Sequence, residues 1–168
     1  MKLNRFFVLT MAALCFIACN KDNDTTTDLT IKLTDNPYNA QEVNVDIQQV
    51  RINFRDDDGG WVDFDTHTGV YNLLDFQNGV DTVIAQTTVP TATIKEVRFV
   101  LGNQNSIKID DVVYPLTIPS GSESGLKIKL NKRLNAHLDS LIIDFDAALS
   151  VIQTGTGEYK LMPVLKIK

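Results

Sequence analysis

The chain has 168 residues, 22% of them charged, and a formal net charge of −5. This length indicates one domain with enough chain to build a hydrophobic core. Contacts to nucleic-acid phosphates need clustered Lys and Arg. The acidic balance therefore excludes nucleic acid as an expected partner.

Residues 1–18 have the pattern of a cleaved export signal. Lys2 and Arg5 precede the uncharged run FFVLTMAALCFIA at residues 6–18, which is a basic region followed by an apolar one. The run is shorter than the roughly 20 residues that a membrane-spanning helix needs. No later apolar run is longer, so we expect no transmembrane helix in the mature protein.

The apolar run ends in Ala18 and Cys19, and this pair resembles the lipobox of bacterial lipoproteins, with Phe16 in place of the common leucine. The resemblance implies that a diacylglyceryl group is attached to Cys19, that the signal is cut before it, and that the new amino group is acylated, for example with palmitate. Each buried CH₂ contributes about 0.8 kcal/mol, and two or more acyl chains anchor a protein stably. We predict lipidation at Cys19.

Two alternatives to Cys19 stay open. Cys15 is the other cysteine, but bulky Leu14 precedes it and apolar residues follow it. The second alternative is that Cys19 is an ordinary, unmodified residue of a secretory signal. The mature chain has no second cysteine, so we expect no intramolecular disulfide.

A polar stretch follows Cys19, and we interpret residues 19–27 as a lipidated tether. Lys21 and the acids after it resemble the export signal of some Bacteroidetes lipoproteins. We therefore expect an outer-membrane protein that is anchored by lipid and exposed at the cell surface; the periplasmic leaflet is the alternative. DTT at 24–26 is similar to a short glycosylation site of those bacteria, with Thr25 as the residue to test.

From Leu29 onward, apolar and polar residues alternate with a period of two, which predicts β-strands. The alternation changes phase at Gln48 and Gln49, which predicts a β-bulge, and Pro163 predicts an edge strand or another bulge. Only two segments have a helical pattern, near 81–86 and near 147–151. The predicted strands cover residues 29–34, 43–54, 61–64, 70–74, 94–101, 106–109, 112–118, 126–130, 138–145 and 159–167.

Many short strands separated by turns rich in Gly, Asn, Asp and Ser predict an all-β fold. We expect one antiparallel β-sandwich, immunoglobulin-like or prealbumin-like, over residues 28–168. It follows the signal peptide at 1–18 and the tether at 19–27.

An ordered set of segments resembles domain of unknown function family 4382, which occurs on bacterial and archaeal lipoproteins. The resemblance covers nearly all of residues 28–168 and implies an extracytoplasmic all-β domain, with no established activity and no site residue to transfer. The family has an Asp-Gly turn where this chain has Asp110–Asp111. The turn therefore lacks the glycine, which adopts a positive φ without strain. The segments are LTIKLTDNP, VNVDIQQVRI, GGWVDF, YNLLDFQNGV, IKEVRFVLGNQNSI, YPLTIPSGSESGLKIKL and LIIDFDAALSVIQTGTGEYKLMPVLK.

Paired carboxylates are the only candidate catalytic feature, because the chain has no G-x-S-x-G motif. Asp144 and Asp146 would lie on one strand face about 7 Å apart, as in some glycoside hydrolases. The alternative is that Asp144 faces solvent, Phe145 faces the core and Asp146 caps a turn at Ala147. We favour this alternative and expect no enzymatic activity and no catalytic residue.

The loop DDDGG at 56–60 is the candidate for calcium, which prefers oxygen ligands. Its spacing does not fit an EF-hand, so Asp35 or Asp110–Asp111 would have to join it. The alternative is a hairpin turn with solvated acids. His67 and His137 are too few for a zinc site. We assign no metal and no cofactor.

Aromatic and basic side chains are the remaining candidates for binding. Trp61 and the tyrosines 38, 71, 114 and 159 would form a glycan platform if exposed, but we expect Trp61 to pack in the core. The basic residues between Lys127 and Arg133 are interpreted as a solvated strand face.

These observations predict a lipid-anchored cell-envelope lipoprotein whose sandwich binds a ligand, such as a glycan, or a protein partner. The alternatives are a purely structural envelope module and, less favoured, a carboxylate-based hydrolase.

Overall fold

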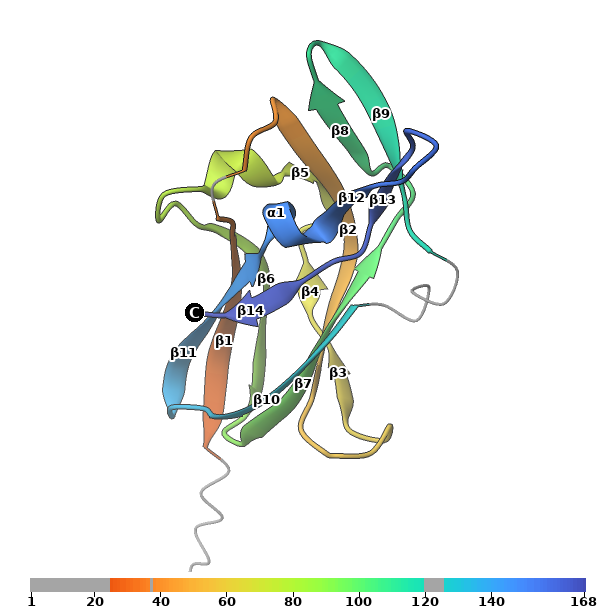
Figure 1. The fold of residues 1–168 in the computed structure, drawn as a ribbon. Helices are drawn as coiled ribbons and strands as arrows, with labels where there is room; N and C mark the ends of the chain where they lie inside the picture. Colours follow the sequence, from red (N-terminus) through yellow and green to blue (C-terminus); the bar gives the residue numbers. More distant parts are fainter. Residues whose placement is uncertain (1–24, 37, 120–125) are drawn as a thin grey trace, which may run out of the picture.

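Two β-sheets pack against each other in the computed structural model, which describes residues 25–36, 38–119 and 126–168 (Figure 1). Sheet A has the strand order β14-β11-β1-β6-β4, and sheet B has the order β10-β7-β2-β8-β9-β13-β12, with β3 and β5 also paired to β2. The predicted all-β sandwich is confirmed. The predicted signal peptide and most of the tether lie outside the described residues.

Most of the elements are short, as the sequence predicted. Sheet A contains β1 (Thr26–Thr34), β4 (Asp65–Thr66), β6 (Thr82–Pro90), β11 (His137–Phe145) and β14 (Leu165–Ile167). Sheet B contains β2 (Glu42–Asn53), β3 (Trp61–Asp63), β5 (Gly69–Asn72), β7 (Thr93–Leu101), β8 (Ser106–Ile109), β9 (Val112–Thr117), β10 (Leu126–Arg133), β12 (Val151–Gln153) and β13 (Tyr159–Leu161). The helical segments are the 3₁₀ helix η1 (Leu73–Phe76) and α1 (Ala147–Ser150).

Antiparallel pairing dominates both sheets, with two exceptions among the described strands. β1 lies parallel to β11, and β13 lies parallel to β9. A tight hairpin forces its two strands to be antiparallel, whereas strands that are distant in sequence can pair in either direction. Both parallel pairs join strands that are distant in sequence.

β2 is the central strand of sheet B. It pairs with β7 and β8 along one edge and with β3 and β5 along the other. Its register against β7 shifts between Ile47 and Gln49, at the predicted bulge. The shift leaves Gln48 exposed, and the apolar side chains on both sides of it point into the core.

The core lies between the sheets and is built from alternate residues of the long strands. Burying each such side chain stabilises the fold by about 1.5–3 kcal/mol. The main contributors are at most 1% exposed: Leu29, Ile31 and Leu33 of β1, Val43, Val45, Ile47, Val50 and Ile52 of β2, Ile94, Val97 and Phe99 of β7, and Leu141, Ile143 and Phe145 of β11.

Several segments differ from their sequence-based predictions, and two of these differences are large. Residues near 81–86 are not helical but begin β6, where β-branched residues favour a strand and pairing with β1 satisfies the backbone. The predicted strand 159–167 is divided into β13 and β14 around Pro163, where the chain passes from sheet B to sheet A. β14 is an edge strand, and the short helix predicted near 147–151 is present as α1.

Within the described residues, no helix is long and apolar enough to cross a membrane.

The β8–β9 hairpin turns through two residues that have positive φ without being glycine. Asp110 has φ 49° and Asp111 has φ 61°, as a two-residue turn of type I′ requires. This is the position where the family resemblance led us to expect glycine. An L-residue in this region costs about 1–2 kcal/mol.

We expect Asp111→Gly to raise the free energy of unfolding by about 0.5–1 kcal/mol, because glycine adopts a positive φ without that cost. Two contacts of the Asp111 carboxylate are lost, an ion pair with Lys108 at 3.3 Å and a hydrogen bond from Gln41 Nε2 at 3.2 Å. Both are at the surface and contribute little. Urea unfolding measures the change. Asp58→Gly, at a position without positive φ, is the control and should give no gain; a less stable Asp111→Gly protein would contradict the prediction.

Candidate functional site

A row of charged residues crosses four neighbouring strands of sheet B. The register places Lys127 of β10 opposite Arg98 of β7, Arg98 opposite Arg51 of β2, and Arg51 opposite Asp63 of β3. Directly opposed residues project from the same face of a sheet. The row therefore contains three adjacent cations and ends in one acid.

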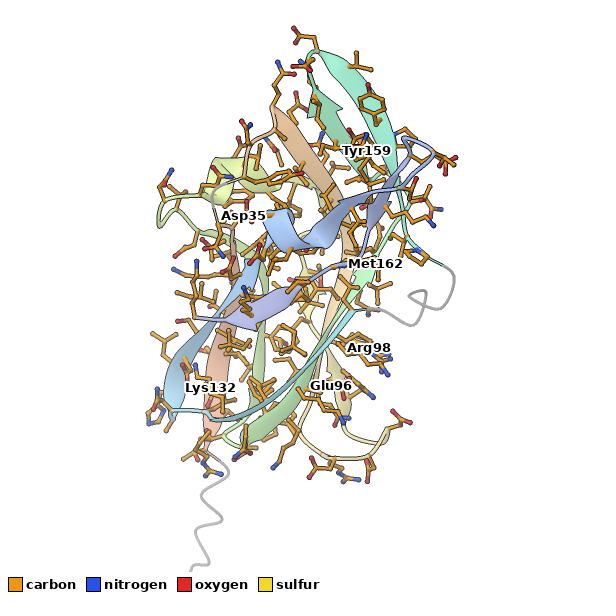
Figure 2. The ribbon with its side chains drawn as sticks, viewed as in Figure 1. Asp35, Glu96, Arg98, Lys132, Tyr159 and Met162 are labelled. Atoms are coloured by element: carbon orange, nitrogen blue, oxygen red, sulfur yellow. The ribbon has the colours of Figure 1, made fainter. Side chains whose placement is uncertain are left out.

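The row lies on the face of sheet B that points away from sheet A. Val97 and Phe99, on either side of Arg98, are 0% exposed in the core. Because side chains alternate along a strand, Arg98 points outward. Figure 2 shows Glu96 and Arg98 on this outer side of β7.

A second row runs beside the first and ends in the only tryptophan of the chain. The register aligns Lys129, Glu96, Asn53 and Trp61 across β10, β7, β2 and β3. We call the five residues Lys127, Lys129, Arg98, Arg51 and Trp61 the basic face.

Trp61 covers the arginines of the first row instead of packing in the core, so the prediction of a core role is wrong. The Cζ of Arg98 lies 4.0 Å from the centre of a Trp61 ring, and the Cζ of Arg51 lies 5.6 Å from it. Trp61 is half-buried and is not part of the hydrophobic core. The reason is the register of β3, which places residue 61 on the outer face of β2, where cation–π contacts hold the ring.

The cations of the basic face have few acidic partners. Lys127 and Lys129 are exposed, and neither is paired within the described residues, whereas Arg51 forms an ion pair with Asp63. Arg98 Nε and Glu96 Oε1 are buried and have no hydrogen-bond partner in the described part of the chain. Although the chain as a whole is acidic, this surface has an excess of positive charge and is complementary to an anionic ligand.

Only part of the basic face was identifiable from the sequence. Lys127 and Lys129 form the predicted solvated strand face, but Lys132 turns toward Asp139, 2.9 Å away. Arg51 and Arg98 were missed as site residues. Their positions between core residues of two strands indicated that they point outward, but only the strand register shows that they are neighbours.

Asp144 is buried, so the prediction that it faces solvent is wrong. It is 1% exposed, because β1 lies alongside the end of β11 and residues after β1 and β14 cover the carboxylate. Asn36 Nδ2 donates to Asp144 Oδ2 at 2.8 Å, and Lys168 Nζ lies 3.2 Å from the same oxygen. Asp144 Oδ1 has no partner within the described residues.

Asp146 caps α1, as predicted. Its Oδ1 accepts a hydrogen bond from the amide of Leu149 at 3.1 Å, and its Oδ2 accepts one from Lys166 Nζ at 2.7 Å. Burial alone would raise the pKa of Asp146, but these donors outweigh burial and hold the pKa below its usual value.

Asp35 completes this group of acids beside α1 (Figure 2). Its Oδ1 accepts from the amide of Ala147 at 2.9 Å, and its Oδ2 accepts from Gln77 Nε2 at 3.3 Å. Burial raises the pKa of Asp35 above its usual value, and the nearby charge of Asp144 adds to the rise. The three acids connect β1, β11, α1 and β14, which is a structural role and gives no support to the hydrolase alternative.

The loop at 56–60 is an exposed turn between β2 and β3. Asp57 Oδ1 accepts a hydrogen bond from the amide of Gly59 at 2.8 Å, the local bonding that favours Asp in turns. The acids that would have to join this loop lie elsewhere: Asp35 is buried beside α1, and Asp110–Asp111 form the β8–β9 turn. In the part of the chain that is described, no three His, Cys, Asp or Glu side chains are arranged to hold a metal ion.

The other predicted residues do not join the basic face. His67 is exposed, with Nδ1 3.3 Å from the carbonyl oxygen of Val83, and His137 begins β11 with φ 72°. The tyrosines at 38, 71, 114 and 159 pack against the core, so no aromatic platform forms from all five residues. Thr25 is exposed, and its glycosylation stays a prediction. Cys19 and Cys15 lie outside the described residues.

We expect Asp146→Asn to lower the free energy of unfolding at pH 7 by about 1 kcal/mol, because it removes the charge paired with Lys166 while Asn remains a good cap. A carboxyl whose pKa is lowered on folding stabilises the fold above its unfolded pKa, and this contribution disappears as pH falls through the folded pKa. The difference between the variant and the wild type should therefore shrink from about pH 5 to below pH 3.

Chemical denaturation at each pH measures this difference. Asp56→Asn, at a side chain that is 87% exposed, is the control and should unfold as the wild type does. An Asp146→Asn penalty that is equally large at pH 7 and pH 3 would show that ionisation of Asp146 is not its source.

Comparison with known proteins gives one match. A family model described as "Domain of unknown function (DUF4382)" matches residues 26–163. No curated protein and no solved structure matches the chain. The matched region begins with β1, ends after β13 and includes every residue of the basic face. The chain belongs to the family of domain of unknown function 4382.

Proposed function

We propose that this chain is a lipid-anchored protein of the cell envelope, held in the outer membrane through Cys19 and exposed at the cell surface, and that its sandwich binds a ligand or partner at the basic face. The observation that carries the binding role is the row of three adjacent cations on the outer face of sheet B, in which Lys127 is exposed and Arg98 and Arg51 lie beneath Trp61. Arg51 is paired with Asp63, but Lys127 and Arg98 form no ion pair within the described residues. Their charges therefore add no ion-pair energy to the fold, which favours a role in recognition.

The anchoring part of the proposal is supported by the sequence. The apolar run ends at Ala18–Cys19, and only a short polar segment separates Cys19 from β1, which begins at Thr26. In Figure 1, the start of β1 and the turn between β2 and β3 lie at the same end of the sandwich. A tether at that end leaves the outer face of sheet B on the side of the domain, accessible to a ligand.

Cys19→Ser should abolish incorporation of labelled palmitate and release the protein from the membrane fraction, because the serine hydroxyl is not the thiol that receives the lipid. Metabolic labelling followed by membrane fractionation measures both effects. Cys15→Ser is the matched control and should label as the wild type does. Label that persists in Cys19→Ser, or that is lost only in Cys15→Ser, would contradict the proposal.

The full chain, purified in detergent, should adsorb to envelopes of the cells that produce it, and Arg98→Gln combined with Lys127→Gln should weaken adsorption at least tenfold. Losing a hydrogen bond to a charged group costs about 1.5–3 kcal/mol, which is roughly tenfold or more in affinity. Lys160→Gln, which removes the same charge from an exposed position on β13, should have no effect. A purely structural module would adsorb equally in all three forms.

A further inference from the structure

We propose that the basic face binds a linear acidic polysaccharide that has a carboxylate on successive sugar units. This inference rests on the proposed function, because it names the ligand class of the same face. It is argued from the spacing of the cations, the position of Trp61 and the charge around them.

The spacing of the cations fits a polymer with one charge on each unit. Lys127, Arg98 and Arg51 are opposed across three adjacent strands, and adjacent strands lie about 4.8 Å apart. A chain that crosses the strands therefore meets a cation at intervals comparable to the length of one sugar ring. Lys129 lies two residues along β10 from Lys127 and widens the positive strip at one end.

Arginine gives the row a preference for carboxylates. A guanidinium group donates two parallel hydrogen bonds to the two oxygens of a carboxylate. Arg51 already forms an ion pair with a carboxylate, that of Asp63, whose side chain is 55% exposed. The neighbouring Arg98 has no ion pair among the described residues, so a ligand carboxylate would provide the same kind of partner one strand further along the row.

Trp61 supplies the apolar surface that a sugar needs. One face of its ring is covered by Arg98 at 4.0 Å, and this contact holds the ring against the outer face of the sheet. A pyranose ring presents C–H groups on its faces, which pack against the face of an aromatic ring. A Trp beside a row of cations therefore suits a carboxylated sugar better than it suits an anion without an apolar face.

A membrane surface is the competing occupant, and the charge near the tether opposes it. β1 begins at the end of the sandwich that carries the β2–β3 turn (Figure 1), and Asp56, Asp57 and Asp58 are exposed in that turn. The turn that contains these acids lies at the same end of the sandwich as the start of β1, and the acids repel anionic headgroups. The basic face lies on the side of the domain instead.

The test uses the full chain in detergent and titrates it with oligogalacturonate, whose sugars each carry a carboxylate. Binding is followed by calorimetry and by the fluorescence of Trp61, the only tryptophan. Neutral dextran, polyglutamate and vesicles of phosphatidylethanolamine and phosphatidylglycerol are titrated in parallel. We expect oligogalacturonate to bind and to change the Trp61 fluorescence, and we expect the other three probes to bind at least tenfold more weakly.

Variants locate the site. Arg98→Gln and Trp61→Ala should each weaken oligogalacturonate binding about tenfold or more, Lys127→Gln should weaken it several-fold, and Lys160→Gln should leave it unchanged. Lys127 is exposed and unpaired within the described residues, so its substitution tests the face even where a change at Arg98 disturbs folding. Melting temperatures of all variants verify that they are folded.

Each other outcome would overturn the inference. Equal binding of dextran would exclude a role for charge, equal binding of polyglutamate would exclude a role for the sugar, and tighter binding of vesicles would assign the face to a membrane. If oligogalacturonate does not bind but adsorption to envelopes still depends on Arg98 and Lys127, the ligand class is wrong and the proposed function stands. If adsorption does not depend on these residues, the proposed function fails as well.

Discussion

The pairing of β2 on both edges is the constraint on which the rest of sheet B depends. Twelve residues, Glu42–Asn53, hold four other strands in register. The bulge near Gln48 allows the strand to change phase without turning its apolar residues away from the core. The same register brings Arg51 between Arg98 and Asp63, so the hydrogen bonds that stabilise the sheet also assemble the basic face.

The second sheet depends on a group of buried acids at the end of β1 and β11. A buried carboxylate costs free energy unless it is paired or hydrogen-bonded, and Asp35, Asp144 and Asp146 each accept a hydrogen bond from another part of the chain. Lys166 and Lys168 neutralise part of the charge. These acids join the parallel pair of strands to α1 and β14, which explains why they are buried in a fold whose other acids are mostly exposed.

The acids beside α1 and the basic face differ in their exposure to solvent. The acids beside α1 are closed off and support the fold. The basic face is open, contributes little apolar burial and concentrates positive charge on an acidic domain. Under the proposed function, negative charge elsewhere on the domain would disfavour non-specific contact with other anions, and the basic face would attract an anionic ligand.

The sequence by itself determined most of the long strands, the bulge in β2, the hairpin turn at Asp110–Asp111 and the cap at Asp146, because each depends on local alternation or on turn and cap chemistry. The sequence is also the basis for the prediction that Cys19 is lipidated. Only the tertiary structure decided which strands are neighbours, because pairing between distant strands is set by packing rather than by local pattern. The burial of Asp144, the parallel β1–β11 pair and the stacking of Trp61 on Arg98 all depend on those pairings. Asp144 and Asp146 therefore lie in a group of acids that joins several strands, and the candidate site forms from residues that are neighbours only in the folded sheet.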